Sequence, residues 1–265
     1  MIFTDQLSRK IDLPETPQRI ISLVPSQTEL LYDLGVRDEV VGITKFCIHP
    51  KEWHETKTRI GGTKNIDFEK IKQLEPDLII GNKEENDQQQ IEELYKHFNV
   101  WMSDINTLKD SFEMMTRLGA MLGKYHESIN LKIEIEFKFN NFNIPNKFSS
   151  PKNIAYFIWR NPYMIAGRNT FINDMLTRCG FNNAFSSDAS SRYPEVTKEQ
   201  IMKANPEIIF LSSEPFPFNE EHIMELQAIC PDAKVMIVDG EMFSWYGSRL
   251  LQAPAYFTKL IQLLM

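Results

Sequence analysis

Side chains able to do metal or nucleophilic chemistry are few and scattered in this chain of 265 residues. Cys47, His49 and His54 lie close in the sequence, but the two histidines are five positions apart, so one helix face would not present both to a zinc ion. Cys47 and His49 offer a pair of ligands for a soft metal. We favour the alternative, a loop thiol beside a solvated imidazole, and predict no metal site.

Enzyme motifs are missing from the sequence. It contains no glycine-rich phosphate loop, no nucleophile elbow of the G-x-S-x-G type and no paired-cysteine motif. Cys47, Cys179 and Cys230 are odd in number and widely spaced, which favours free thiols over disulfides. We therefore predict that the chain has no catalytic residue and no intrinsic cofactor.

Aromatic side chains are the more informative feature. Many fall in predicted loops or directly after predicted strands: Phe46, Trp53, Trp159, Tyr163, Tyr193, Phe216, Phe218, Phe243, Trp245 and Tyr246. Ligands of open α/β sheets bind beyond the carboxyl ends of the strands, where such rings can line a cleft for a large flat or apolar ligand. The alternative is that several of them only pack the ends of the lobes. We favour ligand contact most for Trp245.

Two carboxylates, Glu69 and Glu199, occupy equivalent positions in a stretch that the chain contains twice, at residues 66–81 and 196–211. Both copies read Glu, one polar residue, Ile, four more residues and Pro. A Glu in the first turn of a helix interacts favourably with the helix dipole, which by itself explains both residues. Alternatively, the matched carboxylates dock onto paired arginines of a two-fold symmetric partner.

Each copy of the repeat predicts a short helix that leads into a buried strand. Asp67 and Thr197 stand at the N-cap positions, and Pro76 and Pro206 end the helices. The apolar runs that follow do not alternate with polar residues, which is typical of strands covered on both faces. A helix–strand unit repeated so far apart in the sequence indicates two similar lobes.

Strands and helices alternate in both halves, so we predict an α/β fold with two parallel-sheet lobes. Over residues 108–139 apolar residues recur every three or four positions, which predicts one helix about 45–50 Å long. Residues 131–139 also alternate as a strand would, but their good helix formers favour the helix. The predicted domains are an N-terminal lobe (1–106), a connecting helix (107–142) and a C-terminal lobe (143–265), with residues 141–152 as the linker.

Composition narrows the class of protein. The hydrophobic content of 42% and the charged content of 25% suit a soluble chain with a core. A net charge of −7 argues against a nucleic-acid-binding protein. The sequence lacks an apolar run of about twenty residues, which a membrane-spanning helix needs. Its first 19 residues lack the apolar core of a signal peptide, which predicts a cytoplasmic chain or a mature chain whose leader is not shown.

Three stretches in order, RIISLVPSQTE (residues 19–29), Gly61-Gly62 and residues 69–80, resemble the solute-binding proteins of cobalamin and ferric-siderophore ABC importers. The stretches YPEVTKEQ (193–200) and FSWYGSR (243–249) continue the similarity, which is greatest to the cobalamin type and covers nearly the whole chain. This resemblance implies two α/β lobes joined by one long rigid helix over residues 108–139, with the ligand held between the lobes. It also implies that Glu69 and Glu199 contact a permease.

The chain departs from the cobalamin-type pattern at two positions. Tyr193 stands where a Trp is expected, and Asn82 stands where another aromatic residue is expected. The ligand that we predict is a cobalamin-like corrinoid, with haem or a ferric siderophore as alternatives. The predicted ligand contacts are Ser26, Phe46, Trp53, Asn82, Trp159, Tyr193, Glu241, Phe243 and Trp245.

Two functions of different classes remain open at this point. The first is a monomeric, periplasmic solute-binding protein that closes only slightly on its ligand and delivers it to the permease dimer of an ABC importer. The second is an intracellular protein or enzyme that handles a corrinoid or metal chelate on the same fold, which the lack of a signal peptide favours. It would need a titratable cluster from residues such as Cys47, His49 or Glu241.

Overall fold

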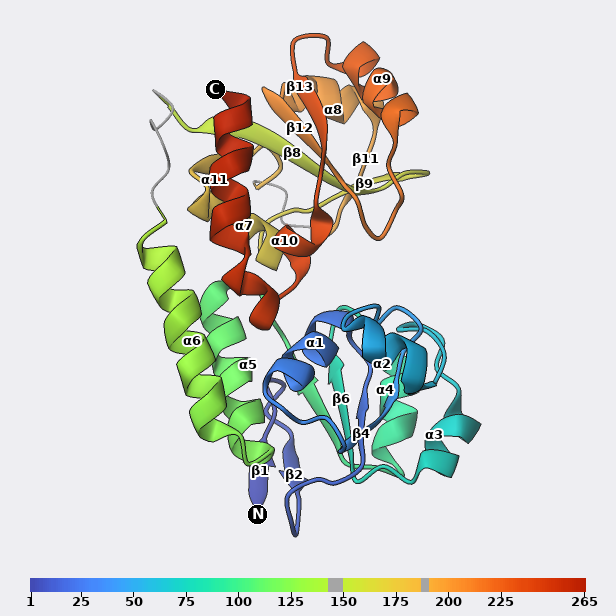
Figure 1. The fold of residues 1–265 in the computed structure, drawn as a ribbon. Coiled ribbons are helices and arrows are strands. Elements are labelled where there is room, and N and C mark those ends of the chain that lie inside the picture. Colours follow the sequence, from blue (N-terminus) through green and yellow to red (C-terminus); the bar gives the residue numbers. More distant parts are fainter. Residues whose placement is uncertain (143–149, 187–190) are drawn as a thin grey trace. The chain divides into compact units, whose positions relative to one another are not determined.

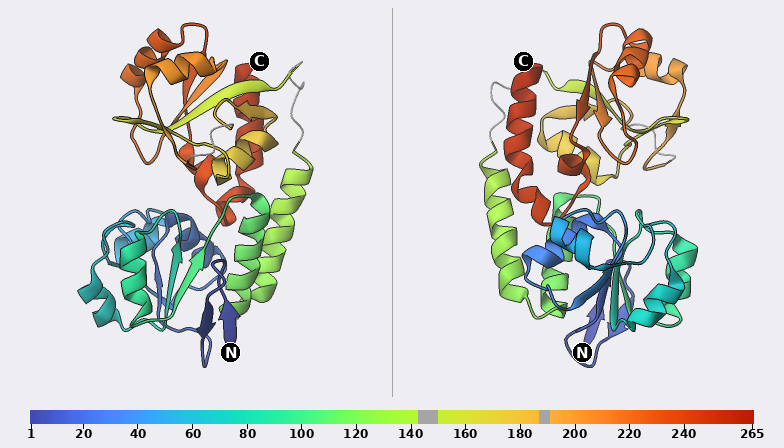
Figure 2. Two further views of the ribbon diagram at one scale, coloured as in Figure 1. Left: turned by 180° about the vertical axis from the view of Figure 1, so that it is seen from behind. Right: turned by 45° about the vertical axis from the view of Figure 1, so that its right-hand side comes forward.

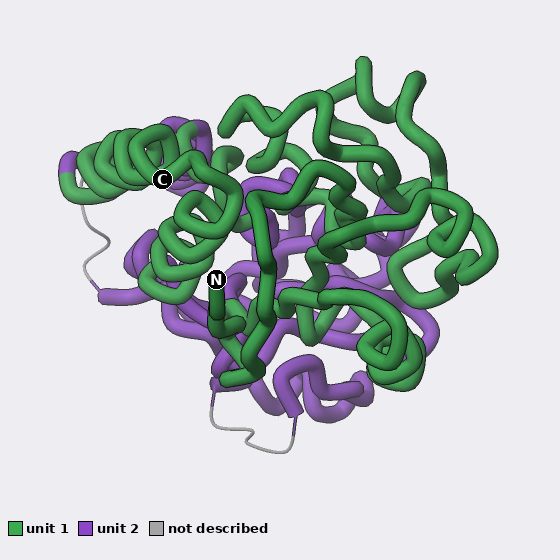
Figure 3. Tube along the Cα trace, turned by 90° about the horizontal axis from the view of Figure 1, so that it is seen from below, with its two compact units in different colours: residues 1–105, 109–140, 246–251 green, residues 106–108, 141–245, 252–265 purple. Residues whose placement is uncertain are grey.

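The computed structural model describes residues 1–142, 150–186 and 191–265. Contacts between residues divide the chain into two compact units, drawn in different colours in Figure 3. Unit 1 comprises residues 1–105, 109–140 and 246–251, and unit 2 comprises residues 106–108, 141–245 and 252–265. In each unit a sheet is flanked by helices (Figures 1 and 2). Most of the predicted linker, residues 143–149, lies outside the described residues.

Unit 1 is built on a five-stranded parallel sheet with the order β5-β4-β3-β6-β7, and it also contains the antiparallel hairpin β1-β2. Its strands are β1 (Ile2–Thr4), β2 (Lys10–Asp12), β3 (Ile20–Ser22), β4 (Val40–Ile43), β5 (Thr58–Arg59), β6 (Leu78–Asn82) and β7 (Val100–Ser103). Its helical segments are α1 (Pro25–Asp33), α2 (Lys51–Thr56), α3 (Phe68–Leu74), α4 (Gln88–Tyr95), α5 (Leu108–Met121), α6 (Tyr125–Asn140) and the 3-10 helix η1 (Ser248–Leu251).

The central strands of this sheet are covered on both faces, as the apolar runs predicted. Every residue of β3 and β6 is buried, and α1, α3 and α4 pack against β3, β4 and β7, respectively. Parallel strands joined by helices have their carboxyl ends at one edge of the sheet. The residues that follow β3, β4, β6 and β7 therefore meet at a single edge of unit 1.

The prediction of one continuous helix over residues 108–139 is wrong. The segment forms two helices, α5 and α6, which lie side by side in Figure 2. Gly123 has a φ of 68°, and the Lys124 amide donates to the Gly119 carbonyl at 2.7 Å, which is the six-to-one bond of a Schellman motif. The two helices are joined by a buried hydrogen bond, in which the Ser128 hydroxyl of α6 donates to the Met115 carbonyl of α5 at 2.6 Å. That residues 107–142 connect two lobes stays a prediction.

Unit 2 contains a six-stranded mixed sheet with the order β11-β9-β8-β12-β13, in which β10 also pairs with β8. The α/β class with parallel sheets is confirmed, but β9 and β11 add an antiparallel edge that the sequence did not predict. The strands are β8 (Lys152–Trp159), β9 (Tyr163–Ile165), β10 (Phe181–Asn183), β11 (Glu195–Val196), β12 (Ile208–Ser212) and β13 (Lys234–Val238). The helices are α7 (Phe171–Arg178), α8 (Lys198–Ala204), α9 (Glu220–Ile229), α10 (Gly240–Ser244) and α11 (Ala253–Leu264).

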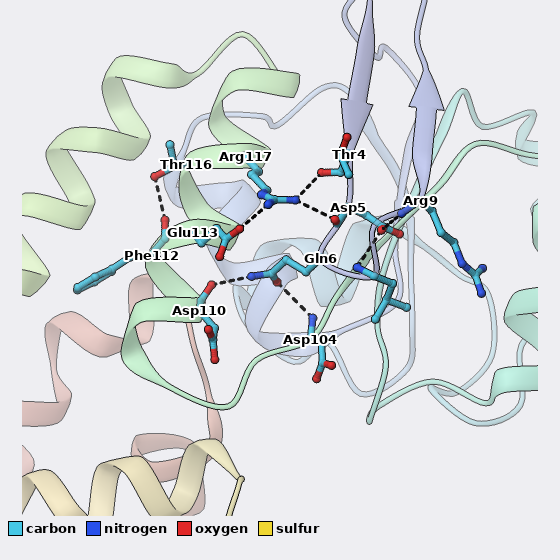
Figure 4. Close-up of polar contacts among 11 residues, drawn as sticks. Thr4, Asp5, Gln6, Arg9, Asp104, Asp110, Phe112, Glu113, Thr116 and Arg117 are labelled. Atoms are coloured by element: carbon cyan, nitrogen blue, oxygen red, sulfur yellow. Dashed lines mark hydrogen bonds and ion pairs between the residues drawn. The ribbon is translucent and has the colours of Figure 1, made fainter.

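The N-terminal hairpin of unit 1 is fastened to the sheet and to α5 through polar contacts (Figure 4). The carboxylate of the buried Asp5 accepts the amides of Leu7, Arg9 and Met102 at 2.9, 2.8 and 3.3 Å. Arg117 of α5 donates to the carbonyls of Thr4 and Asp5, each at 2.8 Å. The edge strand β7 is thus covered by the hairpin, which removes an open strand edge from unit 1.

The segment containing η1 returns to unit 1 far along the chain and is held there by an ion pair. Arg249 donates two hydrogen bonds to the carboxylate of Glu29 in α1, at 2.9 and 2.7 Å. Both side chains are largely buried, and such a bidentate pair is among the stronger charge-assisted contacts. Lys138 of α6 also donates to the Leu251 carbonyl at 3.3 Å.

Candidate functional site

Phe46 is an exposed aromatic side chain at the carboxyl edge of the unit 1 sheet. It follows β4 and is 50% exposed. Its turn is anchored on both sides, since the Lys45 amide donates to the Gly61 carbonyl at 2.8 Å and the buried Cys47 thiol accepts from the Thr28 hydroxyl at 3.0 Å. An anchored turn that presents half of a ring to solvent matches what a ligand contact needs.

Ser26 and Asn82 lie at the same edge but are almost fully buried, at 3% and 2% exposure. The Asn82 amide nitrogen donates to the Ser103 hydroxyl at 2.9 Å, and its carbonyl accepts the Glu84 amide at 2.8 Å. Asn82 therefore joins β6 to β7 and shapes the turn that follows β6. This structural role explains why a polar residue stands where the resemblance led us to expect an aromatic one.

Trp53 packs in the interior of unit 1. Its side chain is only 2% exposed, and its ring meets the edge of Tyr32 with centroids 5.3 Å apart. The Lys57 ammonium lies 5.2 Å from the indole centroid. Trp53 thus joins α2 to α1, and its contact with a ligand stays a prediction.

Unit 2 presents its own exposed aromatic side chain at the carboxyl end of β8. Trp159, the last residue of that strand, is 40% exposed, and its ring lies edge-on to Phe216 at 5.5 Å. Phe216 lies 4.7 Å from Phe218, and His222 of α9 contacts both rings. The predicted contact Trp159 thus belongs to a supported cluster, the Trp159 platform, made of these four residues.

Phe243 and Trp245 are held inside unit 2. Phe243 is fully buried among other rings, with Tyr156 at 5.2 Å and Phe257 at 4.8 Å. Trp245 is 5% exposed, and its indole N–H donates to the Glu214 carboxylate at 2.8 Å. Both side chains pack within unit 2 and are almost fully buried. Their contact with a ligand stays a prediction.

Tyr193 and Glu241, the remaining predicted contacts, are partly buried. The Tyr193 amide donates to the Ser191 hydroxyl at 3.2 Å. Glu241 stands in the first turn of α10, where its amide donates to the carboxylate of the cap residue Asp239 at 3.1 Å. That the side chains of Tyr193 and Glu241 contact a ligand stays a prediction.

Glu69 and Glu199 both stand in the first turn of their helices, α3 and α8, as the repeat predicted. Glu69 is 77% exposed and pairs with Lys72 at 3.1 Å. Glu199 is solvent-exposed, and the Thr197 hydroxyl beside its carboxylate lowers the pKa of that group. Both carboxylates are thus accessible to a partner on the surface of their own unit.

Cys47 and His54 lie close together in unit 1. Cys47 is fully buried, and this burial raises the pKa of its thiol although Thr28 and Thr44 contact the sulfur. His54 contacts the Cys47 carbonyl through Nδ1 at 3.2 Å, not the thiol. Within residues 1–142, 150–186 and 191–265, no group of three His, Cys, Asp or Glu side chains could hold a metal ion.

A polar cluster in unit 2 was missed by the sequence reasoning. Arg160, next to Trp159, donates to both oxygens of Glu225 at 2.9 and 2.6 Å, and Tyr163 donates to the same carboxylate. Burial, together with the hydrogen bond to Glu225, raises the pKa of Tyr163 to about 12. Arg160 and Glu225 are 65 residues apart, so no local pattern could have revealed the pair. It fixes α9 to the end of β8.

Comparisons with known proteins agree with this architecture. A family model described as periplasmic binding protein matches residues 20–228. A vitamin B12-binding protein of Vibrio campbellii is 28% identical over 74% of this chain and 70% of its own length. One of Pectobacterium carotovorum is 25% identical over 89% of this chain and 86% of its own length.

Solved structures show the same fold. The periplasmic vitamin B12 binding protein BtuF of Vibrio cholerae aligns with a TM-score of 0.77 at 21% identity, over 94% of this chain and 98% of that one. The periplasmic heme-binding protein RhuT of Roseiflexus aligns equally well, at 19% identity over 92% of this chain and 97% of that one. In the part of the chain that the structure describes, no helix is both long and apolar enough to span a membrane. The family match over most of the chain settles its class: this protein belongs to the periplasmic binding protein family and is a binding protein, not an enzyme.

Proposed function

We propose that this protein captures a cobalamin-like corrinoid and delivers it to an ABC importer. The observation that carries the proposal is that each unit presents an anchored, exposed aromatic ring at the carboxyl edge of its sheet. In unit 1 this ring is Phe46, and in unit 2 it is Trp159 on its platform. The relatives named vitamin B12-binding protein support the choice of ligand.

The chemistry of the two rings fits a large conjugated ligand. Aromatic side chains bury much apolar area at a small cost in conformational freedom, and they stack on flat or gently puckered rings. Both rings are held by neighbours within their own unit, so fixing them on binding should cost little conformational entropy. This arrangement favours recognition of a macrocycle by shape and apolar contact over recognition by a charged group.

Alanine variants of the two rings test this part of the proposal. Phe46→Ala and Trp159→Ala are each expected to weaken cyanocobalamin binding by roughly tenfold, as the loss of an aromatic anchor commonly does. Tyr125, which is 49% exposed at the start of α6, provides a matched control, because Tyr125→Ala also removes an exposed ring. Unchanged affinity in both anchor variants would contradict the assignment of these rings.

Glu69 and Glu199 are our candidates for contact with the permease dimer. Each is an exposed carboxylate at the start of a repeated helix, and matched carboxylates suit paired arginines on a symmetric partner. The double variant Glu69→Gln and Glu199→Gln should keep its affinity for cyanocobalamin and lose cobalamin uptake in cells that depend on it. Uptake at the wild-type rate would leave both residues as helix-start stabilisers. We also propose that the protein acts as a monomer in the periplasm, since its family is one of periplasmic binding proteins.

Haem and ferric siderophores are the alternative ligands, and the tyrosines speak against haem. A phenolate ligand to ferric haem must lose its proton. Burial raises the pKa of Tyr95, Tyr156, Tyr163, Tyr246 and Tyr256. Tyr163 also donates its proton to Glu225. These five phenols are therefore poor ligands for ferric iron, and the relatives named vitamin B12-binding protein favour the corrinoid.

A further inference from the structure

Gly62 lies against one edge of the Phe46 ring. A Cβ atom built on Gly62 would stand 3.1 Å from Cε2 of Phe46, 3.5 Å from Cε of Lys45 and 3.9 Å from the Asn65 carbonyl oxygen. The first distance is closer than carbon atoms ordinarily approach, whereas the other two are ordinary contacts. The ring of Phe46 is thus the group that a side chain at position 62 would displace.

Two further observations fix how the ring is held. The Lys45 ammonium lies 5.0 Å from the centroid of the Phe46 ring. The backbone beneath is tied down, because the Gly62 amide donates to the Asn65 carbonyl at 2.8 Å and the Lys45 amide donates to the Gly61 carbonyl at 2.8 Å. Since the backbone beside this edge of the ring is held by hydrogen bonds, the ring itself must shift if a side chain is added at position 62.

We infer that Gly62 is a positioning residue for ligand binding: it leaves room for one edge of the Phe46 ring against the loop and so sets the direction of the ring. This inference rests on the proposed function, in which Phe46 contacts the corrinoid. The neighbouring Gly61 has a different role. Its φ of 100° and a Cβ position 2.4 Å from the Asn65 carbonyl oxygen exclude any side chain. Gly62 has no such backbone constraint, so Gly62→Ala tests the contact with the Phe46 ring without forcing a strained backbone.

The test is a double-mutant cycle with cyanocobalamin as the probe, measured by calorimetry on the wild type, Phe46→Ala, Gly62→Ala and the double variant. We expect Gly62→Ala to weaken binding about fivefold, and to have no further effect once the Phe46 ring is gone, because coupled residues are not additive. The inference is overturned if Gly62→Ala binds as the wild type does, or if its loss persists in the Phe46→Ala background.

A second readout needs no ligand and separates this inference from the proposed function. In protein labelled with 4-fluorophenylalanine, the fluorine resonance that disappears in Phe46→Leu reports the ring, and Gly62→Ala should shift it. An unshifted resonance overturns the inference even if cobalamin binds. A shifted resonance in a protein that does not bind cobalamin supports the positioning role while the proposed ligand fails. If Gly62→Ala does not fold, the Phe46→Ala background should restore folding, and failure to do so would show that Gly62 acts elsewhere.

Discussion

The two copies of the repeated segment, α3 with β6 and α8 with β12, have similar backbone conformations but different exposed side chains. Asp67 caps α3 by accepting the Lys70 amide at 3.1 Å, and Thr197 caps α8 by accepting the Gln200 amide at 3.3 Å. Both helices end on a left-handed residue, Glu75 or Asn205, with the same φ of 44°. Every residue of β6 and β12 is buried.

The glutamates of the two copies are held by different neighbours. Glu69 pairs with Lys72, whereas the equivalent of Lys72 in the second copy is Met202, whose side chain is 55% exposed. Glu199 relies instead on the hydroxyl of Thr197, which a carboxylate at the equivalent Asp67 could not supply. The repeat therefore preserves the elements that build the sheet, while each unit offers a partner a different chemical face around its glutamate.

The largest effects should come from the part that both copies share. Ile71 and Ile201 are equivalent and fully buried, so each change to Ala should lower the free energy of unfolding by about 2–5 kcal/mol. Ile133→Ala on α6, where the side chain is 56% exposed, should change it by less than about 0.5 kcal/mol. Urea unfolding followed by circular dichroism measures all three. If only one of the two buried variants lost less free energy of unfolding than Ile133→Ala, the two copies would not be structurally equivalent.

Removing the caps should cost less, and similar amounts in both copies. Asp67→Ala and Thr197→Ala each delete the acceptor for a free helix amide, which typically costs about 1 kcal/mol. Thr197→Ser keeps the hydroxyl and should stay close to the wild type, which makes it the matched control. If Thr197→Ser were as destabilising as Thr197→Ala, the methyl group of Thr197 would matter, and the capping bond would not.

The left-handed ends of α3 and α8 give a smaller effect of opposite sign. A left-handed conformation is costly for Glu and better tolerated by Asn. Glu75→Gly should therefore raise the free energy of unfolding by about 0.5 kcal/mol, and Asn205→Gly should raise it less. Glu75→Ala serves as the control, because Ala has the same backbone strain as Glu. Thermal unfolding of the three variants ranks their stabilities. If Glu75→Ala were stabilised as much as Glu75→Gly, relief of backbone strain at position 75 would be excluded as the cause.

The smallest effect concerns the pH dependence of stability at Glu199. Its pKa in the folded protein lies below the ordinary value because Thr197 donates a hydrogen bond to the carboxylate. The stabilisation is therefore present above the unfolded pKa and is lost as pH falls through the folded pKa. Glu199→Gln should flatten the loss of stability between pH 5 and pH 3, roughly the range in which carboxyl groups titrate. Unfolding curves that stay parallel to those of the wild type across this range would contradict the hydrogen bond.

Much of the fold could be predicted because the relevant signals are local. Caps, prolines and apolar runs lie within a few residues of the elements that they define, and Thr197 and Pro206 mark both ends of α8 correctly. The break between α5 and α6 was missed because the apolar stripe continues across Gly123, although glycine is the usual residue after a helix end. The pair of Glu29 and Arg249 joins residues 220 positions apart, so no local pattern could indicate it.

The sequence does not reveal which of its aromatic residues are exposed, for a physical reason. An aromatic residue after a strand can turn into the core or out to solvent, and the sequence around it is similar in both cases. Phe46 and Trp159 turn outward, whereas Trp53 and Phe243 pack inward against rings that are distant in the sequence. Only the packing of the folded unit separates exposed rings from core residues.

Calorimetric titration of the purified protein with cyanocobalamin, with haem and a ferric siderophore as comparisons, tests whether the protein binds a corrinoid. We predict saturable one-to-one binding of cyanocobalamin with a dissociation constant in the micromolar range or tighter, and weaker binding of the other two ligands. Binding of haem or the siderophore without binding of cyanocobalamin would contradict the claim.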